Sequence, residues 1–151
     1  MNEIAIIPTT ADHIDAIYEI ELESFTAPWP KDAFPELMES PTTHFITAIN
    51  EKSKIVGFAA MYIVSDEAQI LNIAVTPAAR NQGAGAKLLS SMIKTAAEEN
   101  VSEIYLEVRA SNAKAQSLYK SHGFTALAVR KNYYQSPAED AILMRRKDSQ
   151  T

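Results

Sequence analysis

Apolar residues recur along the first forty residues in a pattern that predicts one short strand and two helices. Residues 4–7 are an apolar run that a proline ends, as in a short strand. Apolar positions at helical spacing then continue to Phe25, and two prolines around Trp29 stop that helix. A second, shorter helix is predicted from about Asp32 to Met38. The predicted buried stripe of the first helix is Ile14, Ile17, Tyr18 and Leu22.

The middle of the chain is typical of strands. Residues 43–50 and 54–64 flank the polar turn 51–53, which predicts a hairpin. Residues 69–75 are almost continuously apolar, as expected of a buried central strand that Pro77 ends.

From Gly85 the period changes to that of an amphipathic helix, with Asn100 as its predicted left-handed cap. A clean alternation follows from Ile104 to Arg109 and predicts a strand. Asn112 is the predicted cap of a helix over 113–121. The predicted buried stripe of the first of these helices is Leu88, Leu89, Met92, Ile93, Ala96 and Ala97.

Two final strands are predicted, near 124–129 and 140–144, around an aromatic turn formed by Asn132, Tyr133 and Tyr134. The complete order is β-α-α-β-β-β-α-β-α-β-β. Hairpins on both sides of one β-α-β crossover predict a mixed, mostly antiparallel sheet of about seven strands flanked by about four helices. The fold class is therefore α/β in the broad sense, with an α+β arrangement.

Length and composition predict one domain over residues 1–146, followed by a polar tail at 147–151. The chain has 151 residues, of which 46% are hydrophobic and 22% charged, which is enough apolar material for one core. With no cysteine, a disulfide framework, a thiolate metal site and a cysteine nucleophile are all excluded. The three histidines lack metal-ligand spacing, so no metal is expected.

The start of the chain and its charge indicate a cytoplasmic protein. Residues 1–4 are acidic and soon followed by Pro8, which is unlike a signal peptide, and no apolar run approaches the ~18–20 residues that span a bilayer. The net charge of −5, without a basic run, argues against direct nucleic-acid binding and is compatible with a basic partner. The oligomeric state is left open.

One segment, residues 75–86, joins the buried strand to the start of the strongest helix. Gly83 and Gly85 would let a ligand approach the backbone, and the free N–H groups of the helix start suit a phosphate. A Walker A loop and a dinucleotide fingerprint both fail here, because Ala86-Lys87-Leu88 supplies neither Gly-Lys-Ser/Thr nor a third glycine. An ordinary tight strand-to-helix turn is the alternative for this segment alone.

The pattern that remains, Arg-x-x-Gly-x-Gly at 80–85, resembles the pyrophosphate loop of the GNAT superfamily of N-acetyltransferases. Further segments resemble the same family, and more narrowly its RimI branch, bacterial enzymes that acetylate protein N-termini. In the order of the chain, these segments are Ser24-Phe25-Thr26-Ala27-Pro28-Trp29, Leu71-Asn72-Ile73-Ala74-Val75, Leu106-Glu107-Val108-Arg109-Ala110-Ser111-Asn112, Ser117-Leu118-Tyr119-Lys120-Ser121-His122-Gly123-Phe124 and Arg130-Lys131-Asn132-Tyr133-Tyr134 with Glu139-Asp140-Ala141.

The resemblance implies a GNAT fold and acetyl-coenzyme A as co-substrate. It also implies a bulge in the fourth strand that frees a backbone N–H near Val75 to polarise the thioester carbonyl, which is oxyanion-hole chemistry. The implied cofactor-binding positions are Ile73, Ala74 and Val75 for the pantetheine arm, Asn81, Gln82, Gly83, Ala84, Gly85 and Ala86 for the pyrophosphate, and Asn112 as a further contact.

By the same resemblance, Glu107 is the general base and Tyr119 the general acid. The strand alternation independently turns Glu107 away from the face that Ile104, Leu106 and Val108 bury, and apolar neighbours there would suit a proton acceptor. The alternative for Glu107 is a solvated side chain or a partner of Arg109. Tyr119 is protonated at neutral pH and able to donate; its alternative is a tyrosine that anchors its helix to the sheet.

Trp29, Tyr133 and Tyr134 are candidate acceptor-binding residues, in loops that could close over an extended peptide N-terminus, or else aromatic residues that cover core edges. The implied reaction is direct acetyl transfer in a ternary complex to the N-terminal alanine of ribosomal small-subunit protein eighteen. Two alternatives stay open: an acetyltransferase for small amines such as polyamines or antibiotics, and a non-catalytic acyl-coenzyme A-binding module. Gln69, where relatives often have glutamate, and Ala84, where they have a larger aliphatic residue, depart from the family pattern.

Overall fold

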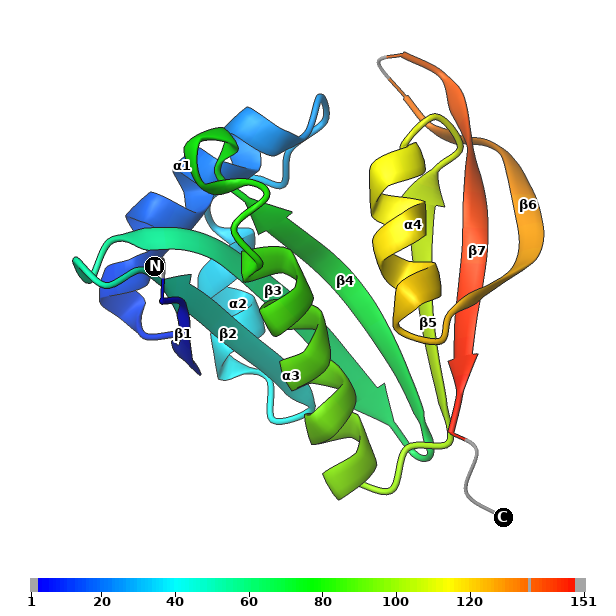
Figure 1. The fold of residues 1–151 in the computed structure, drawn as a ribbon, viewed down its shortest axis with the longest axis horizontal. Helices are drawn as coiled ribbons and strands as arrows, with labels where there is room; N and C mark the ends of the chain where they lie inside the picture. The colour runs from blue at the N-terminus through cyan, green and yellow to red at the C-terminus, as the bar shows by residue number, and fades with distance from the viewer. Residues whose placement is uncertain (1–2, 136, 149–151) are drawn as a thin grey trace.

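The computed structural model describes residues 3–135 and 137–148, which form one seven-stranded sheet with two helices on each face. Figure 1 shows α3 and α4 on the near face, and α1 and α2 behind the sheet. The strands are β1 (Ala5–Pro8), β2 (Thr43–Ile49), β3 (Ile55–Val64), β4 (Glu67–Val75), β5 (Glu103–Arg109), β6 (Thr125–Tyr134) and β7 (Glu139–Lys147). The helices are α1 (Ile14–Ser24), α2 (Ala33–Glu39), α3 (Ala84–Glu98) and α4 (Ala113–Ser121), with 3-10 turns at Ala11–His13 and Pro77–Ala79.

The predicted element order and the mixed sheet are both confirmed. The strands lie in the order β1-β2-β3-β4-β5-β7-β6, and every neighbouring pair is antiparallel except β4 with β5. This single parallel pair is the crossover through α3, since parallel neighbours need a long connection. β7 continues to Lys147, one residue beyond the domain boundary expected from the sequence, and residues 149–151 of the expected tail lie outside the described part.

Two hydrophobic clusters hold the layers together. The cluster under α3 and α4 includes Leu88, Leu89, Met92, Tyr119 and Phe124, and the cluster under α1 and α2 includes Ile14, Ile17, Ile20, Phe34 and Phe58. Among the described residues, no helix is both long enough and apolar enough to span a bilayer.

One residue of the stripe predicted for α1 was wrong. Leu22 is 49% exposed, and the neighbouring Glu21 is buried in its place. The buried carboxylate accepts a hydrogen bond from the Trp29 N–H over 2.9 Å and another from the Asn72 amide over 2.7 Å. These two donors offset the cost of removing the carboxylate from water. Hydrophobic periodicity alone does not reveal such donors.

The close packing of α3 on the sheet depends on Gly57 in β3. A Cβ at this position would lie 2.8 Å from the carbonyl oxygen of Ala74 and 3.2 Å from Leu88 Cδ1. Only glycine therefore fits between β4 and the first turns of α3. This contact places the start of α3 beside the end of β4.

Candidate active site

β4 and β5 pair over three residues and then diverge. Glu67, Ala68 and Gln69 pair with Glu103, Ile104 and Tyr105, and no later residue of β4 pairs with β5 within the described part of the chain. Figure 1 shows the two strands separating from this point toward the start of α3. We call the opening between the diverging strands the β4–β5 fork. Along this fork, main-chain groups on the β5-facing edge of β4 have no strand partner.

The predicted pantetheine-binding residues lie on this diverging half of β4. Ile73, Ala74 and Val75 pair with β3 on the other side, opposite Ala59, Phe58 and Gly57. The bulge expected in the fourth strand is confirmed. Asn72 pairs with Ala60 and Ile70 with Met61, which leaves Leu71 as the extra residue. The bulge therefore precedes Ile73, Ala74 and Val75. The free N–H expected near Val75 stays a prediction.

The predicted pyrophosphate loop leads from β4 into α3. Asn81 and Gly83 have φ of 65° and 88°, the left-handed conformation that turns the backbone, and Gly83 is the N-cap of α3. None of the N–H groups of residues 81–86 donates a hydrogen bond to another described residue; the Lys87 N–H is the first to do so, to the Gly83 carbonyl. Unpaired donors at the positive end of a helix suit an anionic group.

Within this loop, Asn81, Gln82 and Gly83 are exposed, and Ala84 is buried in the core. Gly85 and Ala86 are half-buried, and Gly85 lies against Leu118 of α4 and Val75. Asn112, the predicted cap of α4, accepts the Ala115 N–H over 3.1 Å, so the cap is confirmed. Its side-chain amide group remains able to donate to a ligand.

Glu107 lies on β5, two residues past the last β4–β5 pair, with only 10% of its side chain exposed. Its carboxylate has polar partners rather than the expected apolar surroundings. Gln69 Nε2 donates to Oε1 over 2.9 Å, and Arg130 Nε of β6 lies 3.0 Å from Oε2. The ionic partner of Glu107 is thus Arg130 and not Arg109. A nearly buried carboxylate held by two donors is an oriented proton acceptor.

Tyr119 lies on α4 and is nearly buried, with its ring 6.0 Å from that of Phe124. Burial raises the pKa of its hydroxyl far above the ordinary value, and the nearby Tyr134 hydroxyl raises it further. Within the described residues, the Tyr119 hydroxyl makes no hydrogen bond, so its proton is not committed to a protein acceptor. The group can pack as an anchor and also donate to a ligand.

Tyr133 and Tyr134 lie at the end of β6, so the turn predicted at residues 132–134 was wrong. Asn132 has a φ of 51°, and the β6–β7 register shifts between Arg130 and Tyr134. The left-handed asparagine therefore produces an irregularity inside the strand instead of a reversal. The two rings meet edge to face at 5.0 Å, and the Arg109 guanidinium lies 4.4 Å from the centroid of Tyr134.

The two tyrosines and Glu107 lie close enough to interact electrostatically. Burial raises the pKa of Tyr134 to about 12, with smaller contributions from Tyr133 and from the Glu107 charge. Burial also raises the pKa of Tyr133, and again the Glu107 charge contributes. Both hydroxyls are therefore neutral donors at physiological pH.

Trp29 lies between α1 and α2, where Glu21 holds its backbone N–H and its ring lies 5.8 Å from Phe34. It lines a surface cavity of about 530 Å³ together with Pro30, Leu37, Tyr62 and Leu71. Tyr62 pairs with Gln69 in the β3–β4 register, and Gln69 donates the hydrogen bond to Glu107.

Sequence reasoning missed four residues that shape this site: Gly57, Glu21, Arg109 and Arg130. A lone charged residue inside an apolar helix stripe was the available signal for Glu21. The other three act through partners far along the chain, which a single sequence does not reveal. Over residues 3–135 and 137–148, no group of three or more His, Cys, Asp or Glu side chains is placed to hold a metal ion.

Comparison with known proteins identifies the family. The model of the Acetyltransferase (GNAT) family matches residues 14–124. The chain belongs to this family. It is an acyltransferase. A relative from Bacillus subtilis (strain 168) is 43% identical over 134 residues, covering 88% of each chain.

Three further comparisons agree with this result. The [Ribosomal protein bS18]-alanine N-acetyltransferase of Escherichia coli (strain K12) is 38% identical over 146 residues, covering 95% of this chain and 96% of the relative. The crystal structure of the ribosomal-protein-S18-alanine N-acetyltransferase from Escherichia coli superposes with a TM-score of 0.88 at 34% identity, over 100% of this chain and 96% of that one. The structure of Ard1 from Thermoplasma volcanium superposes with a TM-score of 0.89 at 28% identity, over 97% of this chain and 99% of that one.

Proposed function

We propose that this GNAT protein transfers the acetyl group of acetyl-coenzyme A to the α-amine of the N-terminal alanine of ribosomal protein bS18. Similarity over almost the whole chain to enzymes named for that reaction supports the acceptor. The observation that carries the chemistry is the position of Glu107, oriented by Gln69 and Arg130 just beyond the last β4–β5 pair.

In this proposal the unpaired N–H groups of residues 81–86 bind the diphosphate. The open edge of β4 at Ile73, Ala74 and Val75 holds the pantetheine arm, and the Asn112 amide is a further donor. A main-chain N–H on this edge polarises the thioester carbonyl, in the manner of an oxyanion hole. These groups bind and orient; none of them exchanges a proton.

Two side chains move protons. Glu107 removes a proton from the acceptor amine, directly or through a water molecule, so that the nitrogen can form its bond to the acetyl carbon. As the carbon–sulfur bond breaks, Tyr119 protonates the departing thiolate. Burial keeps the Tyr119 hydroxyl protonated until then, because it raises its pKa. The transfer is direct, and the chain has no cysteine to form an acetyl-enzyme.

The acceptor would enter on the α1–α2 side, between Trp29 and the pair Tyr133 and Tyr134. The cavity beside Trp29 offers an apolar surface to residues that follow the acceptor alanine, and the net charge of −5 favours a basic peptide. Tyr133 and Tyr134, as neutral donors close to Glu107, can bind main-chain carbonyl groups of an extended peptide.

The test is mass spectrometry of ribosomal proteins after incubation with this protein and isotopically labelled acetyl-coenzyme A. We expect label on the α-amine of the bS18 alanine, and far less label in the same time with the Glu107→Gln variant. Label on lysine side chains only, or turnover only with polyamines or aminoglycosides, would contradict the proposal and favour a small-amine acetyltransferase. Nucleotide binding without turnover on any of these acceptors would indicate a binding module.

A further inference from the structure

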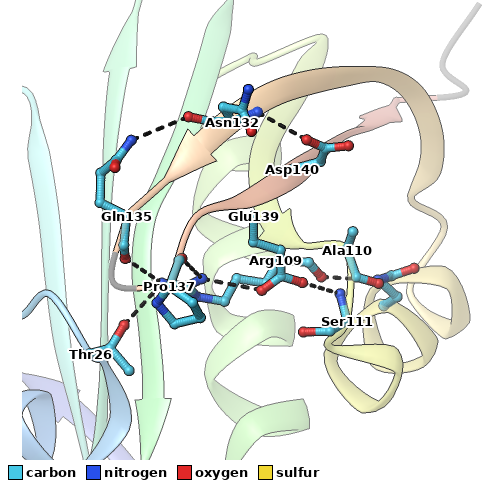
Figure 2. A network of polar contacts seen from close by, with 10 residues as sticks. Thr26, Arg109, Ala110, Ser111, Asn132, Gln135, Pro137, Glu139 and Asp140 are labelled. Carbon is cyan, nitrogen blue, oxygen red and sulfur yellow. Dashed lines mark hydrogen bonds and ion pairs between the residues drawn. The ribbon is translucent and has the colours of Figure 1, made fainter.

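Arg109, the last residue of β5, uses every terminal N–H of its guanidinium. Nη1 donates to the Pro137 carbonyl and to Glu139 Oε1, each over 3.2 Å. Nη2 donates to Thr26 Oγ1 over 3.0 Å and to the Gln135 carbonyl over 3.3 Å. Figure 2 shows these four contacts converging on the one side chain. Four of the five N–H donors of the guanidinium thereby have acceptors.

The partners of Arg109 come from two segments that are far apart in the sequence. Thr26 lies between α1 and α2, 83 residues before Arg109, beside the stretch that carries Trp29. Gln135 and Pro137 lie in the turn between β6 and β7, directly after Tyr133 and Tyr134. The guanidinium therefore joins the α1–α2 connection to the β6–β7 turn.

Arg109 is itself held in place. Glu139 accepts the Ser111 N–H through its second oxygen over 2.6 Å, and Gln116 Nε2 donates to the carbonyls of Arg109 and Ala110 over 3.1 and 3.0 Å. The side chains of Arg109 and Glu139 are 22% and 19% exposed, so solvent screens the pair less than an exposed ion pair. The guanidinium is thus pre-oriented from its own strand.

The same guanidinium sets the position of the aromatic pair. Its centre lies 4.4 Å from the centroid of the Tyr134 ring, within the range of a cation–π contact, and Tyr134 packs edge to face on Tyr133. A displaced Arg109 would release Tyr134 and, through it, Tyr133.

We infer that Arg109 is a positioning residue that joins the two walls of the acceptor site, the α1–α2 connection and the β6–β7 turn with its tyrosines. The inference deepens the proposed function and rests on it, because these segments are the proposed acceptor walls. Within the described residues, no hydrogen bond or ion pair joins Arg109 to Glu107 or to the loop at residues 81–86. Its loss should weaken acceptor binding and leave acetyl-coenzyme A binding intact.

The test compares Arg109→Gln with a matched control, Arg145→Gln. Arg145 is also a partly buried arginine that pairs with a glutamate, Glu103, but at the opposite end of β5. Hydrogen exchange, detected by mass spectrometry, measures whether Arg109 stabilises the α1–α2 connection and the β6–β7 turn. We expect Arg109→Gln to speed exchange in peptides that carry Thr26 and in peptides that carry Gln135, and Arg145→Gln to leave both unchanged.

Kinetics then measure the consequence for the acceptor. In Arg109→Gln, the KM for a bS18 N-terminal peptide should rise about tenfold or more, with kcat within about threefold of the parent and the Kd of acetyl-coenzyme A unchanged. Arg109→Lys should resemble Arg109→Gln, because an ammonium cannot reproduce the planar fork. Thr26→Val, which removes a single contact, should give a smaller rise.

The hydrogen-exchange and kinetic experiments together distinguish failure of this inference from failure of the proposed function on which it rests. Unchanged exchange in either segment, or full recovery in Arg109→Lys, would overturn the joining role whatever the acceptor is. Faster exchange in both segments, with no turnover of any peptide by the parent protein, would support the joining role and contradict the proposed function. A fall in kcat with an unchanged acceptor KM would overturn the acceptor role of Arg109.

Discussion

Gln69 and Glu107 are joined side chain to side chain across the fork between β4 and β5, at 2.9 Å between Nε2 and Oε1. Gln69 is the last residue of β4 that pairs with β5, and Glu107 lies two residues past its partner Tyr105. The hydrogen bond therefore fixes the carboxylate where the strands begin to separate. An amide at this position orients Glu107 without placing a second negative charge beside it.

This relationship predicts a kinetic effect for Gln69→Leu. The variant removes one of the two donors to Glu107 and leaves Arg130 as its partner, so the carboxylate should be less well oriented. We expect kcat to fall about tenfold, since misplacement of a catalytic group is costly, with the Kd of acetyl-coenzyme A unchanged. Steady-state kinetics and calorimetry check the two parts; an unaltered kcat would show that Arg130 alone orients Glu107.

The pyrophosphate loop gives a second prediction, at Gly83. A Cβ there meets nothing within 4 Å, but the φ of 88° strains any residue that avoids the left-handed region. Gly83→Ala should therefore cost about 1–2 kcal/mol in the free energy of unfolding or in loop rearrangement, and weaken acetyl-coenzyme A binding.

Gly83→Asn is the control for this position, because asparagine tolerates the left-handed conformation. It should bind acetyl-coenzyme A more tightly than Gly83→Ala in calorimetry. The reverse order would mean that lack of a side chain, rather than backbone conformation, is what the loop requires.

Gly57 yields a prediction about stability. Because an added Cβ would lie 2.8 Å from the Ala74 carbonyl oxygen, Gly57→Ala should lower the free energy of unfolding by about 1–3 kcal/mol through overpacking. Gly85→Ala is the matched control, since its Cβ would meet Leu118 Cδ2 at an ordinary 3.5 Å. Urea unfolding of both variants checks this; equal effects would contradict the close-approach role of Gly57.

Glu21 gives stability a pH dependence with a definite sign. Burial raises its pKa above the ordinary 4.5 in the folded protein, although the Trp29 N–H lowers it in part. Between the two pKa values the folded protein therefore holds a proton that the unfolded chain has lost. The contribution of Glu21 to the free energy of unfolding should fall as the pH rises from about 4.5 through the folded pKa.

Urea unfolding of the parent and of Glu21→Gln across this pH range measures the contribution. The stability of the parent minus that of the variant should fall with rising pH, because glutamine does not titrate and other carboxylates cancel in the difference. A difference that is constant with pH would show that Glu21 titrates alike in both states.

Local rules were enough to predict the elements from the sequence. The Asn112 cap, the left-handed Asn100 and most of the apolar stripe of α3 are each encoded within a few residues, and the structure has them. Ala97 was wrong as a residue of that stripe, because it is exposed near the end of the helix. The asparagine at position 132 is also left-handed, as in a turn. It lies inside β6 because pairing with β7 extends the strand, and this tertiary contact outweighs the local preference.

The partners of the candidate site residues could not be predicted from the sequence and became visible only in the structure. The sequence places Glu107 on the correct face of its strand, but its partners Gln69 and Arg130 lie on other strands. The same holds for Arg109, whose partner Thr26 is 83 residues away. The bulge at Leu71 depends on the register between two strands, which hydrophobic alternation does not fix.

The most direct test is to measure acetyl-coenzyme A binding and bS18-peptide acetylation side by side in the parent protein and Glu107→Gln. Removing the base should lower kcat by about 10²–10⁴-fold, while calorimetry gives the same Kd for acetyl-coenzyme A in both proteins. An unaltered kcat in Glu107→Gln, or a parent protein that does not bind acetyl-coenzyme A, would contradict the assignment of this fork as the catalytic centre.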